Sequence, residues 1–181
     1  ELRAIRLEQL QHQVDGRPLL PGDRAERHFL VRLGRKHEAI DVARLIDAAQ
    51  GTEPTDIRNI CLIELLYGAG LRASECCDLP LSSLPAPSTS VLIVRGKGDK
   101  ERIAPLGQPA LKALKAWMAV REQFLPKTAI RSTAQRFVFP SRGGGGRLTR
   151  RRLGQILEDL AMKAGIAMER VRITATTTAK V

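Results

Sequence analysis

Aromatic residues, cysteines and late histidines are scarce in this sequence, and each shortage excludes a class of site. Aromatic residues make up 3% of the 181 positions. The chain therefore has little with which to stack on unpaired bases, and binding to single-stranded RNA is a weak hypothesis. The three cysteines, Cys61, Cys76 and Cys77, contain no Cys-x-x-Cys spacing, and no histidine follows His37. A zinc site is therefore not expected, and the cysteines are predicted to be buried free thiols.

Long apolar runs are also missing. No run approaches the ~18 residues that a membrane-spanning helix requires, and no N-terminal stretch has the pattern of a signal peptide. Apolar residues nevertheless make up 43% of the sequence, which is enough for a folded core. We expect a soluble cytoplasmic protein with one domain, or with one domain and a fragment of another.

Positive charge is abundant, and the second half of the chain carries the excess. The formal net charge is +11. Residues 1–50 include nine basic and eight acidic residues, residues 51–94 include two and five, and residues 95–181 include nineteen and six. Such a localised excess indicates a polyanion partner such as nucleic acid, because each neutralised phosphate releases condensed counterions. The alternative is a basic surface that keeps the protein soluble and has no partner.

The order of predicted elements indicates an α+β fold, mostly helical with a small three-stranded antiparallel sheet. Residues 91–95 and 102–106 are predicted to form a β-hairpin around the turn-forming segment 96–100. A third strand is predicted at residues 137–140. No β-α-β alternation occurs, so a Rossmann or P-loop sheet is not expected. Apolar periodicity and Gly or Pro boundaries predict helices at residues 2–14, 38–50, 57–67, 73–79, 109–125 and 149–164.

The segment 70–75 places an arginine directly after an apolar helix, with a glutamate three residues later. If Glu75 holds Arg72 in place, the guanidinium can bind a phosphate through two parallel hydrogen bonds. The alternative is that Ser74 or Glu75 caps the short helix that begins here.

Basic residues also gather at the hairpin turn and at the start of the last helix. Lys97 and Lys100 lie in the turn, where a lysine can pair with a phosphate or protonate a leaving oxygen, although most turn lysines are merely solvated. Arg150, Arg151 and Arg152 begin the last helix, where each cation near the positive end of the helix dipole costs about 0.3–1 kcal/mol at low salt. A bound phosphate would reverse that sign, so phosphate contact is favoured over a solvent-screened cluster.

Several segments resemble, in the same order, the motifs of the tyrosine recombinase (phage integrase) family, and above all its Xer-type members. Residues 65–75 read LLYGAGLRASE and resemble the segment that carries the first catalytic arginine of the family. Residues 94–106 read VRGKGDKERIAPL and resemble its catalytic-lysine hairpin. Residues 137–141 and 148–150 match the segments that follow.

The resemblance implies a reaction on double-stranded DNA that needs no metal and no cofactor. In this family a tyrosine attacks the scissile phosphate and forms a 3′-phosphotyrosyl link. By motif match, Arg72 would hold the phosphate oxygens, Glu75 would help to build the site, and Lys97 would act as general acid toward the 5′ oxygen. The other predicted DNA contacts are Lys100, Arg102, Arg147, Arg150, Arg151 and Arg152.

The resemblance stops near residue 171. The family continues with a His-x-x-Arg motif and the nucleophilic tyrosine, whereas this sequence has no histidine after His37 and a single tyrosine, Tyr67, inside an apolar helix. We therefore expect a chain that is truncated within the catalytic domain. The expected parts are a linker or remnant of an N-terminal DNA-clamping domain (1–36), a partial catalytic domain (37–171) and a tail unlike the family (172–181).

Such a chain is predicted to bind DNA and to be unable to cleave it alone. A second expected partner is an intact recombinase protomer, because some family members receive the tyrosine from a neighbouring protomer. The alternative is a non-catalytic DNA-binding or regulatory module that acts with an intact recombinase.

Overall fold

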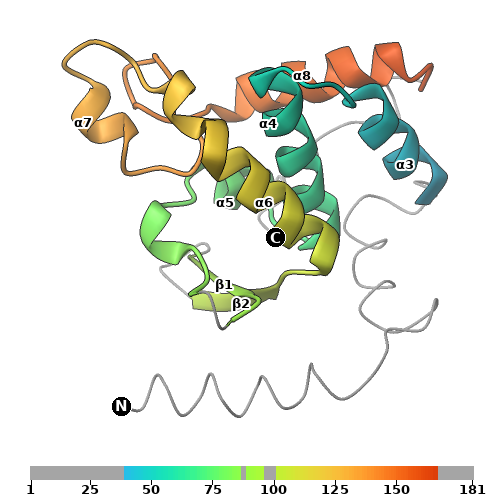
Figure 1. The fold of residues 1–181 in the computed structure, drawn as a ribbon, viewed down its shortest axis with the longest axis horizontal. Coiled ribbons are helices and arrows are strands. Elements are labelled where there is room, and N and C mark those ends of the chain that lie inside the picture. The colour runs from blue at the N-terminus through green and yellow to red at the C-terminus, as the bar shows by residue number, and fades with distance from the viewer. Residues whose placement is uncertain (1–38, 87–88, 96–100, 167–181) are drawn as a thin grey trace, which may run out of the picture.

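Helices form most of the structure, and a β-hairpin lies at one end of it (Figure 1). The computed structural model describes residues 39–86, 89–95 and 101–166. The main helices are α3 (Ala39–Ala48), α4 (Pro54–Ile63), α5 (Ala73–Cys77), α6 (Gln108–Val120), α7 (Arg131–Ala134) and α8 (Arg150–Lys163). The strands are β1 (Val91–Arg95) and β2 (Glu101–Pro105), and shorter helical turns are Glu64–Gly68 (π-helical), Leu81–Ser83 and Arg121–Phe124 (both 3-10).

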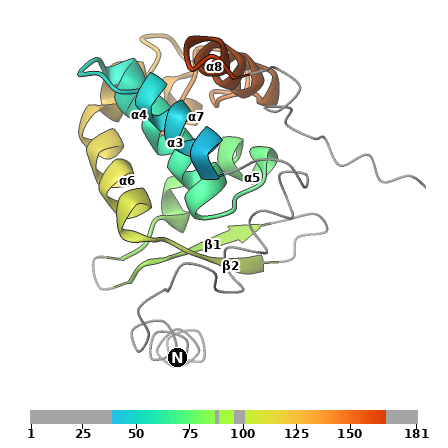
Figure 2. The same cartoon turned by 90° about the vertical axis from the view of Figure 1, so that its right-hand side faces the viewer.

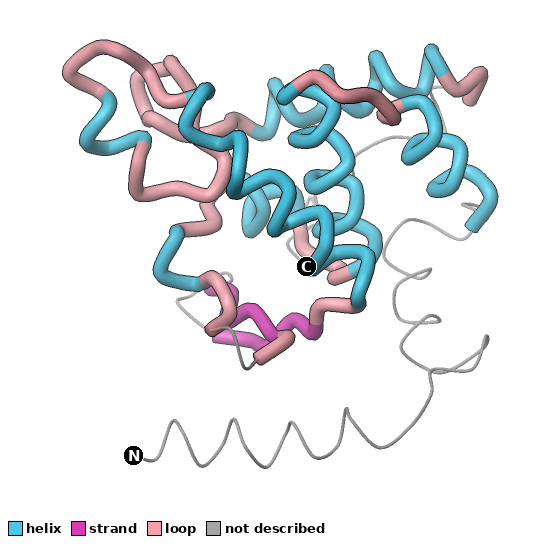
Figure 3. Tube along the Cα trace, viewed as in Figure 1, coloured by secondary structure: helices cyan, strands magenta, loops and turns pink. Residues whose placement is uncertain are grey.

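Two perpendicular views place α8 at the end of the structure opposite the hairpin, with α4, α5 and α6 between them (Figure 1, Figure 2). Loops connect the short helix α7 to α6 and to α8 (Figure 3). The α+β class, mostly helical with an antiparallel sheet, is therefore confirmed. The predicted helix at residues 2–14 and the predicted tail lie outside the described residues. Within the described ranges, no helix combines the length and apolar character that crossing a membrane requires.

The hairpin is confirmed, and its two faces differ in polarity. Leu92 lies opposite Ala104 and Ile93 lies opposite Ile103 in the antiparallel register. Successive side chains of a strand point to opposite faces. Leu92 and Ala104 are fully buried in the core, whereas Ile93 and Ile103 are exposed on the outer face.

The predicted third strand at residues 137–140 is wrong, because the described sheet has two strands, β1 and β2. Phe137 and Pro140 form isolated bridges only, to Pro80 and Arg147. A proline has no N–H to donate to a ladder, so bridges that involve Pro80 and Pro140 do not extend into strands.

Side chains from α6 and the turn after it take the carbonyl groups of this segment instead. Trp117 Nε1 donates to the Val138 oxygen at 2.9 Å. Arg121 Nη2 donates to the oxygens of Phe137 and Gln135 at 2.6 and 2.8 Å, and Arg121 is 5% exposed. Side chains rather than a neighbouring strand thus satisfy these buried acceptors, and the segment is fixed as a loop.

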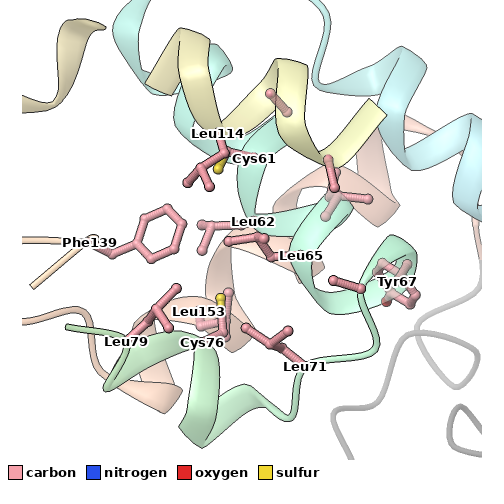
Figure 4. Close-up of a cluster of buried hydrophobic side chains, with 14 of the residues drawn as sticks. Cys61, Leu62, Leu65, Tyr67, Leu71, Cys76, Leu79, Leu114, Phe139 and Leu153 are labelled. Atoms are coloured by element: carbon pink, nitrogen blue, oxygen red, sulfur yellow. The ribbon is translucent and has the colours of Figure 1, made fainter. Parts of the chain in front are cut away.

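The core gathers side chains from most of the elements (Figure 4). Cys61 and Leu62 of α4 are fully buried, together with Leu153 of α8 and Phe139, and Leu114 of α6 is buried beside them. The prediction of a buried helix at residues 57–67 is confirmed for its second half, whereas Ile57 and Ile60 of the first half are only partly buried against the core. Each apolar side chain fully removed from water stabilises the fold by roughly 1.5–3 kcal/mol. The predicted burial of all three cysteines as free thiols is also confirmed.

Candidate functional site

The loop that carries Arg72 follows the π-helical turn Glu64–Gly68, and this turn determines the path of the loop. Leu71 lies after the π-helical turn, and its N–H donates back to the oxygen of Leu65, within the turn, at 3.0 Å. Gly70 has a φ of +62°, a conformation that residues with a Cβ rarely adopt. Leu71 is buried in the core. Arg72 follows Leu71, and its side chain is half exposed at the surface (50%).

Glu75 is buried beside Arg72 and accepts four hydrogen bonds. Its side chain is 2% exposed. Oε1 accepts from Arg72 Nη1 at 2.9 Å and from Arg102 Nε at 3.2 Å. Oε2 accepts from the Arg72 backbone N–H at 2.8 Å and from Arg102 Nη2 at 2.5 Å. A carboxylate has about four lone-pair sites, so the acceptor capacity of Glu75 is filled.

Glu75 makes the contacts that both interpretations of this segment require, and binding of a phosphate by Arg72 stays a prediction. Glu75 pairs with the side chain of Arg72, as predicted, and it also satisfies a backbone N–H at the start of α5. Burial by itself raises the pKa of Glu75, but the hydrogen bonds and charge of Arg102, together with the hydrogen bonds from Arg72, outweigh burial and leave the pKa below its usual value. The carboxylate is ionised at neutral pH and holds Arg72 as a fixed cation.

Arg102 donates hydrogen bonds to three oxygen atoms, which belong to two residues. Besides both oxygens of Glu75, its Nη2 donates to the carbonyl oxygen of Gly70 at 2.9 Å. Its side chain is 28% exposed. These hydrogen bonds join strand β2 to the loop that carries Arg72.

The three arginines at the start of α8 form a second basic group. Arg150, Arg151 and Arg152 are exposed in the first turn of the helix, as the sequence predicted. Thr149 caps that turn, because its hydroxyl oxygen accepts from the Arg152 N–H at 3.2 Å. The first turn holds no acidic residue, so the positive end of the helix dipole and three cations lie together.

Arg147 lies beside this group and is held in place from two sides. Its Nε donates to Asp78 Oδ1, and its guanidinium lies over the ring of Phe137, 5.4 Å from the ring centre. The side chains of Arg147 and Asp78 are 42% and 55% exposed. Arg147 is thus oriented but still accessible to an anion.

Arg58 adds a cation that the sequence analysis missed. It lies on α4 over the ring of Phe124, 5.3 Å from the ring centre. Burial lowers the pKa of Arg58, and the positive charge of Arg152 lowers it further. A bound anion would relieve this repulsion between α4 and α8. Arg58 could not be recognised as a site residue from the sequence alone. It comes close to Arg152, on α8, only when the protein folds.

Helix α5 connects the Arg72 loop with the start of α8. It begins directly after Arg72 and packs against α8. At its end, burial and the Asp78 carboxylate raise the pKa of Cys77 to about 12, while the charges of Arg150 and Arg147 act in the opposite direction. The two basic groups therefore belong to one connected part of the fold.

Two predicted site residues, Lys97 and Lys100, belong to residues 96–100 between β1 and β2, which lie outside the described residues. Among the residues that are described, no cluster of His, Cys, Asp and Glu could hold a metal ion.

Comparison with known proteins identifies the family. The model of the Phage integrase family matches residues 37–177. The chain belongs to the phage integrase family. Its relatives include the tyrosine recombinase XerD of Caulobacter vibrioides, which is 47% identical over 135 residues covering 74% of this chain and 43% of that protein. The tyrosine recombinase XerC of Actinobacillus pleuropneumoniae serotype 7 is 36% identical over 135 residues, covering 75% of this chain and 41% of that protein.

Solved structures show the same fold. XerA recombinase superposes with a TM-score of 0.57 at 23% identity, covering 75% of this chain and 46% of that one. XerH recombinase bound to its difH substrate superposes with a TM-score of 0.59 at 21% identity, covering 78% and 42%. The predicted similarity of this phage integrase chain to Xer-type tyrosine recombinases is confirmed. The chain spans less than half of the length of these relatives.

Proposed function

We propose that this chain binds the backbone of double-stranded DNA and acts in site-specific DNA recombination and integration as a tyrosine recombinase homologue. The observation that carries the proposal is the half-exposed guanidinium of Arg72, held by a buried and ionised Glu75. Such a preoriented cation can bind a phosphate at little cost in side-chain entropy. XerH site-specific recombinase, whose fold this chain shares, is bound to difH substrate in its structure.

The basic group on α8 extends this contact along the backbone. Arg147 is preoriented by Asp78 and Phe137, and Arg150, Arg151 and Arg152 surround a helix N-terminus, which itself favours anions. In this proposal Arg72 binds one phosphate and the α8 group binds others. In this proposal Lys97 and Lys100, which lie between β1 and β2 in the sequence, add charge, with Lys97 as general acid toward a leaving 5′ oxygen.

We further propose that these 181 residues do not cleave DNA by themselves. Cleavage in this family needs a tyrosine nucleophile, and the sequence has one tyrosine. Tyr67 is buried in the core, and burial raises its pKa to about 12. A buried phenol with a raised pKa is a poor nucleophile for a phosphate outside the core.

Binding is tested by titrating the purified chain against a labelled mixed-sequence DNA duplex at several salt concentrations. We expect tight binding at low salt and a linear fall of log K with log salt, with a slope of about −0.9 per phosphate contact. The same titration with single-stranded RNA is the control. Tighter binding to RNA, or a duplex affinity that salt does not change, would contradict DNA backbone binding.

Cleavage is tested with a pool of nicked suicide duplexes of randomised sequence. We expect no covalent protein–DNA adduct from this chain alone. A parallel reaction that contains an intact Xer-type recombinase shows whether a tyrosine supplied by a partner restores adduct formation. A covalent adduct formed by this chain without a partner overturns the second proposal and leaves the first intact.

A further inference from the structure

Arg102 occupies an inward-facing position of the hairpin. It lies opposite Val94, which is buried, while its neighbours Glu101 and Ile103 on β2 are exposed. The alternation of the strand therefore directs Arg102 toward the helices. Its side chain is 28% exposed, compared with 68% for Arg95 on the same hairpin.

The guanidinium of Arg102 already has a bidentate carboxylate partner. Nε and Nη2 donate to the two oxygens of Glu75 at 3.2 and 2.5 Å, and Nη2 also donates to the Gly70 oxygen at 2.9 Å. An arginine binds phosphate with the same kind of two-nitrogen edge. A phosphate could use this edge only by displacing Glu75.

The contacts of Arg102 fix both ends of the segment that presents Arg72. At one end, the carbonyl of Gly70 is held while this glycine is in its left-handed conformation. At the other end, Glu75 is oriented so that one oxygen is available to Arg72 Nη1 and the other to the Arg72 backbone N–H. Among the described residues, Arg72 donates through its backbone N and Nη1, and no hydrogen bond of Nε or Nη2 is found. The half-exposed Arg72 edge that contains Nε and Nη2 is therefore available to a ligand.

We propose that Arg102 is a positioning residue, which orients Arg72 toward a DNA phosphate through Glu75 and Gly70 and does not bind DNA itself. This inference rests on the proposed DNA binding. It changes the role that the sequence assigned to Arg102, from a direct DNA contact to an internal one.

A double-mutant cycle on DNA binding separates these two roles. The variants are Arg72→Gln, Arg102→Gln and the double variant, each titrated against a labelled mixed-sequence duplex at several salt concentrations. If Arg102 acts through Arg72, each single variant lowers the affinity by about tenfold, and the double variant is no worse than Arg72→Gln. The salt slope then falls by about 0.9 in all three, because the same phosphate contact is lost. Additive losses, with a slope change of about 1.8 in the double variant, overturn the proposal.

Arg102→Lys gives an independent readout. Lysine keeps the positive charge and can still attract a phosphate. It lacks the planar guanidinium, however, and cannot donate to both oxygens of Glu75 and to the Gly70 carbonyl at once. We expect Arg102→Lys to bind DNA as weakly as Arg102→Gln. Restoration of wild-type affinity by lysine would show that only charge matters at this position, and the proposal would be wrong.

Arg95→Gln is the matched control, since it removes one positive charge from the same hairpin. Arg95 lies on the outer face of the hairpin, in an ion pair with Glu101. Its effect on affinity should add to that of Arg72→Gln. Thermal melts establish that each variant is folded, and if the double variant with glutamine is not, Arg102→Lys replaces Arg102→Gln in the cycle. If the wild-type chain does not bind duplex DNA, the proposed function is refuted. If the effects of Arg72→Gln and Arg102→Gln on affinity are additive, only the role of Arg102 is refuted.

Discussion

Trp117 and Arg121, four residues apart, both donate to the carbonyl oxygen of Val138, at 2.9 and 3.2 Å. The ring of Trp117 also stacks on Phe139, with 5.6 Å between the ring centres. These contacts fix the loop that leads from α7 to the arginines of α8. Stability and the candidate DNA contacts are therefore linked through one buried arginine.

Replacement of Arg121 should destabilise the protein. Arg121→Gln is expected to lower the free energy of unfolding by about 2–4 kcal/mol, because several buried carbonyl groups lose their donor. Urea denaturation measures this value. Arg131→Gln, which changes an exposed arginine on α7, is the control and should stay within about 0.5 kcal/mol of the wild type. An equally small effect for Arg121→Gln would show that water replaces the guanidinium without cost.

The arginines at the start of α8 should account for part of the salt dependence of DNA binding. Changing Arg150, Arg151 and Arg152 to Gln is expected to weaken binding to all duplex sequences and to flatten the salt slope by about 0.9 per lost phosphate contact. The control removes the same charge elsewhere, by changing the exposed lysines Lys112, Lys115 and Lys163 to Gln. If both triple variants change the slope equally, the α8 group has no special role.

The contribution of Glu75 to stability should depend on pH. Its pKa is lowered in the folded protein, so it stabilises the fold above the ordinary carboxyl pKa of about 4.3 and loses this effect as the pH falls through the lower folded value. Glu75→Gln should therefore be less stable than the wild type near pH 7, and the difference should shrink in acid. Urea denaturation of both proteins between about pH 3 and pH 7 tests this expectation. A difference that grows in acid would mean that the pKa is raised instead.

Gly146 should not tolerate a side chain. Its φ is +67°, and an added Cβ would lie 2.8 Å from the backbone nitrogen of Ala134. Gly146→Ala is expected to destabilise the protein by about 1–3 kcal/mol and to displace the adjacent Arg147. Gly144→Ala in the same loop is the control, because a Cβ there meets nothing within 4 Å. Equal melting temperatures for the two variants would show that the loop moves freely around Gly146.

Local sequence patterns predicted much of the fold. The all-round apolar character of residues 57–67 indicated a buried helix, and the two β-rich runs around a Gly-rich turn indicated a hairpin. Residues 137–140 look equally like a strand, yet they form a loop. That outcome depends on the side chains of Trp117 and Arg121 and on Pro80, all distant in the sequence, and no local pattern contains such information.

The sequence by itself determined the family and the order of the basic segments along the chain, because motif order and charge are local properties. The i,i+3 spacing of Arg72 and Glu75 made their pairing possible, and the structure showed it. Only the tertiary structure decided what surrounds each cation. It placed Arg102 on Glu75, 27 residues away in the chain, Arg147 on Asp78, and Arg58 near Arg152. In the sequence these arginines look alike, because charge is a property of the residue, whereas the partner of a charge depends on how helices and hairpin pack.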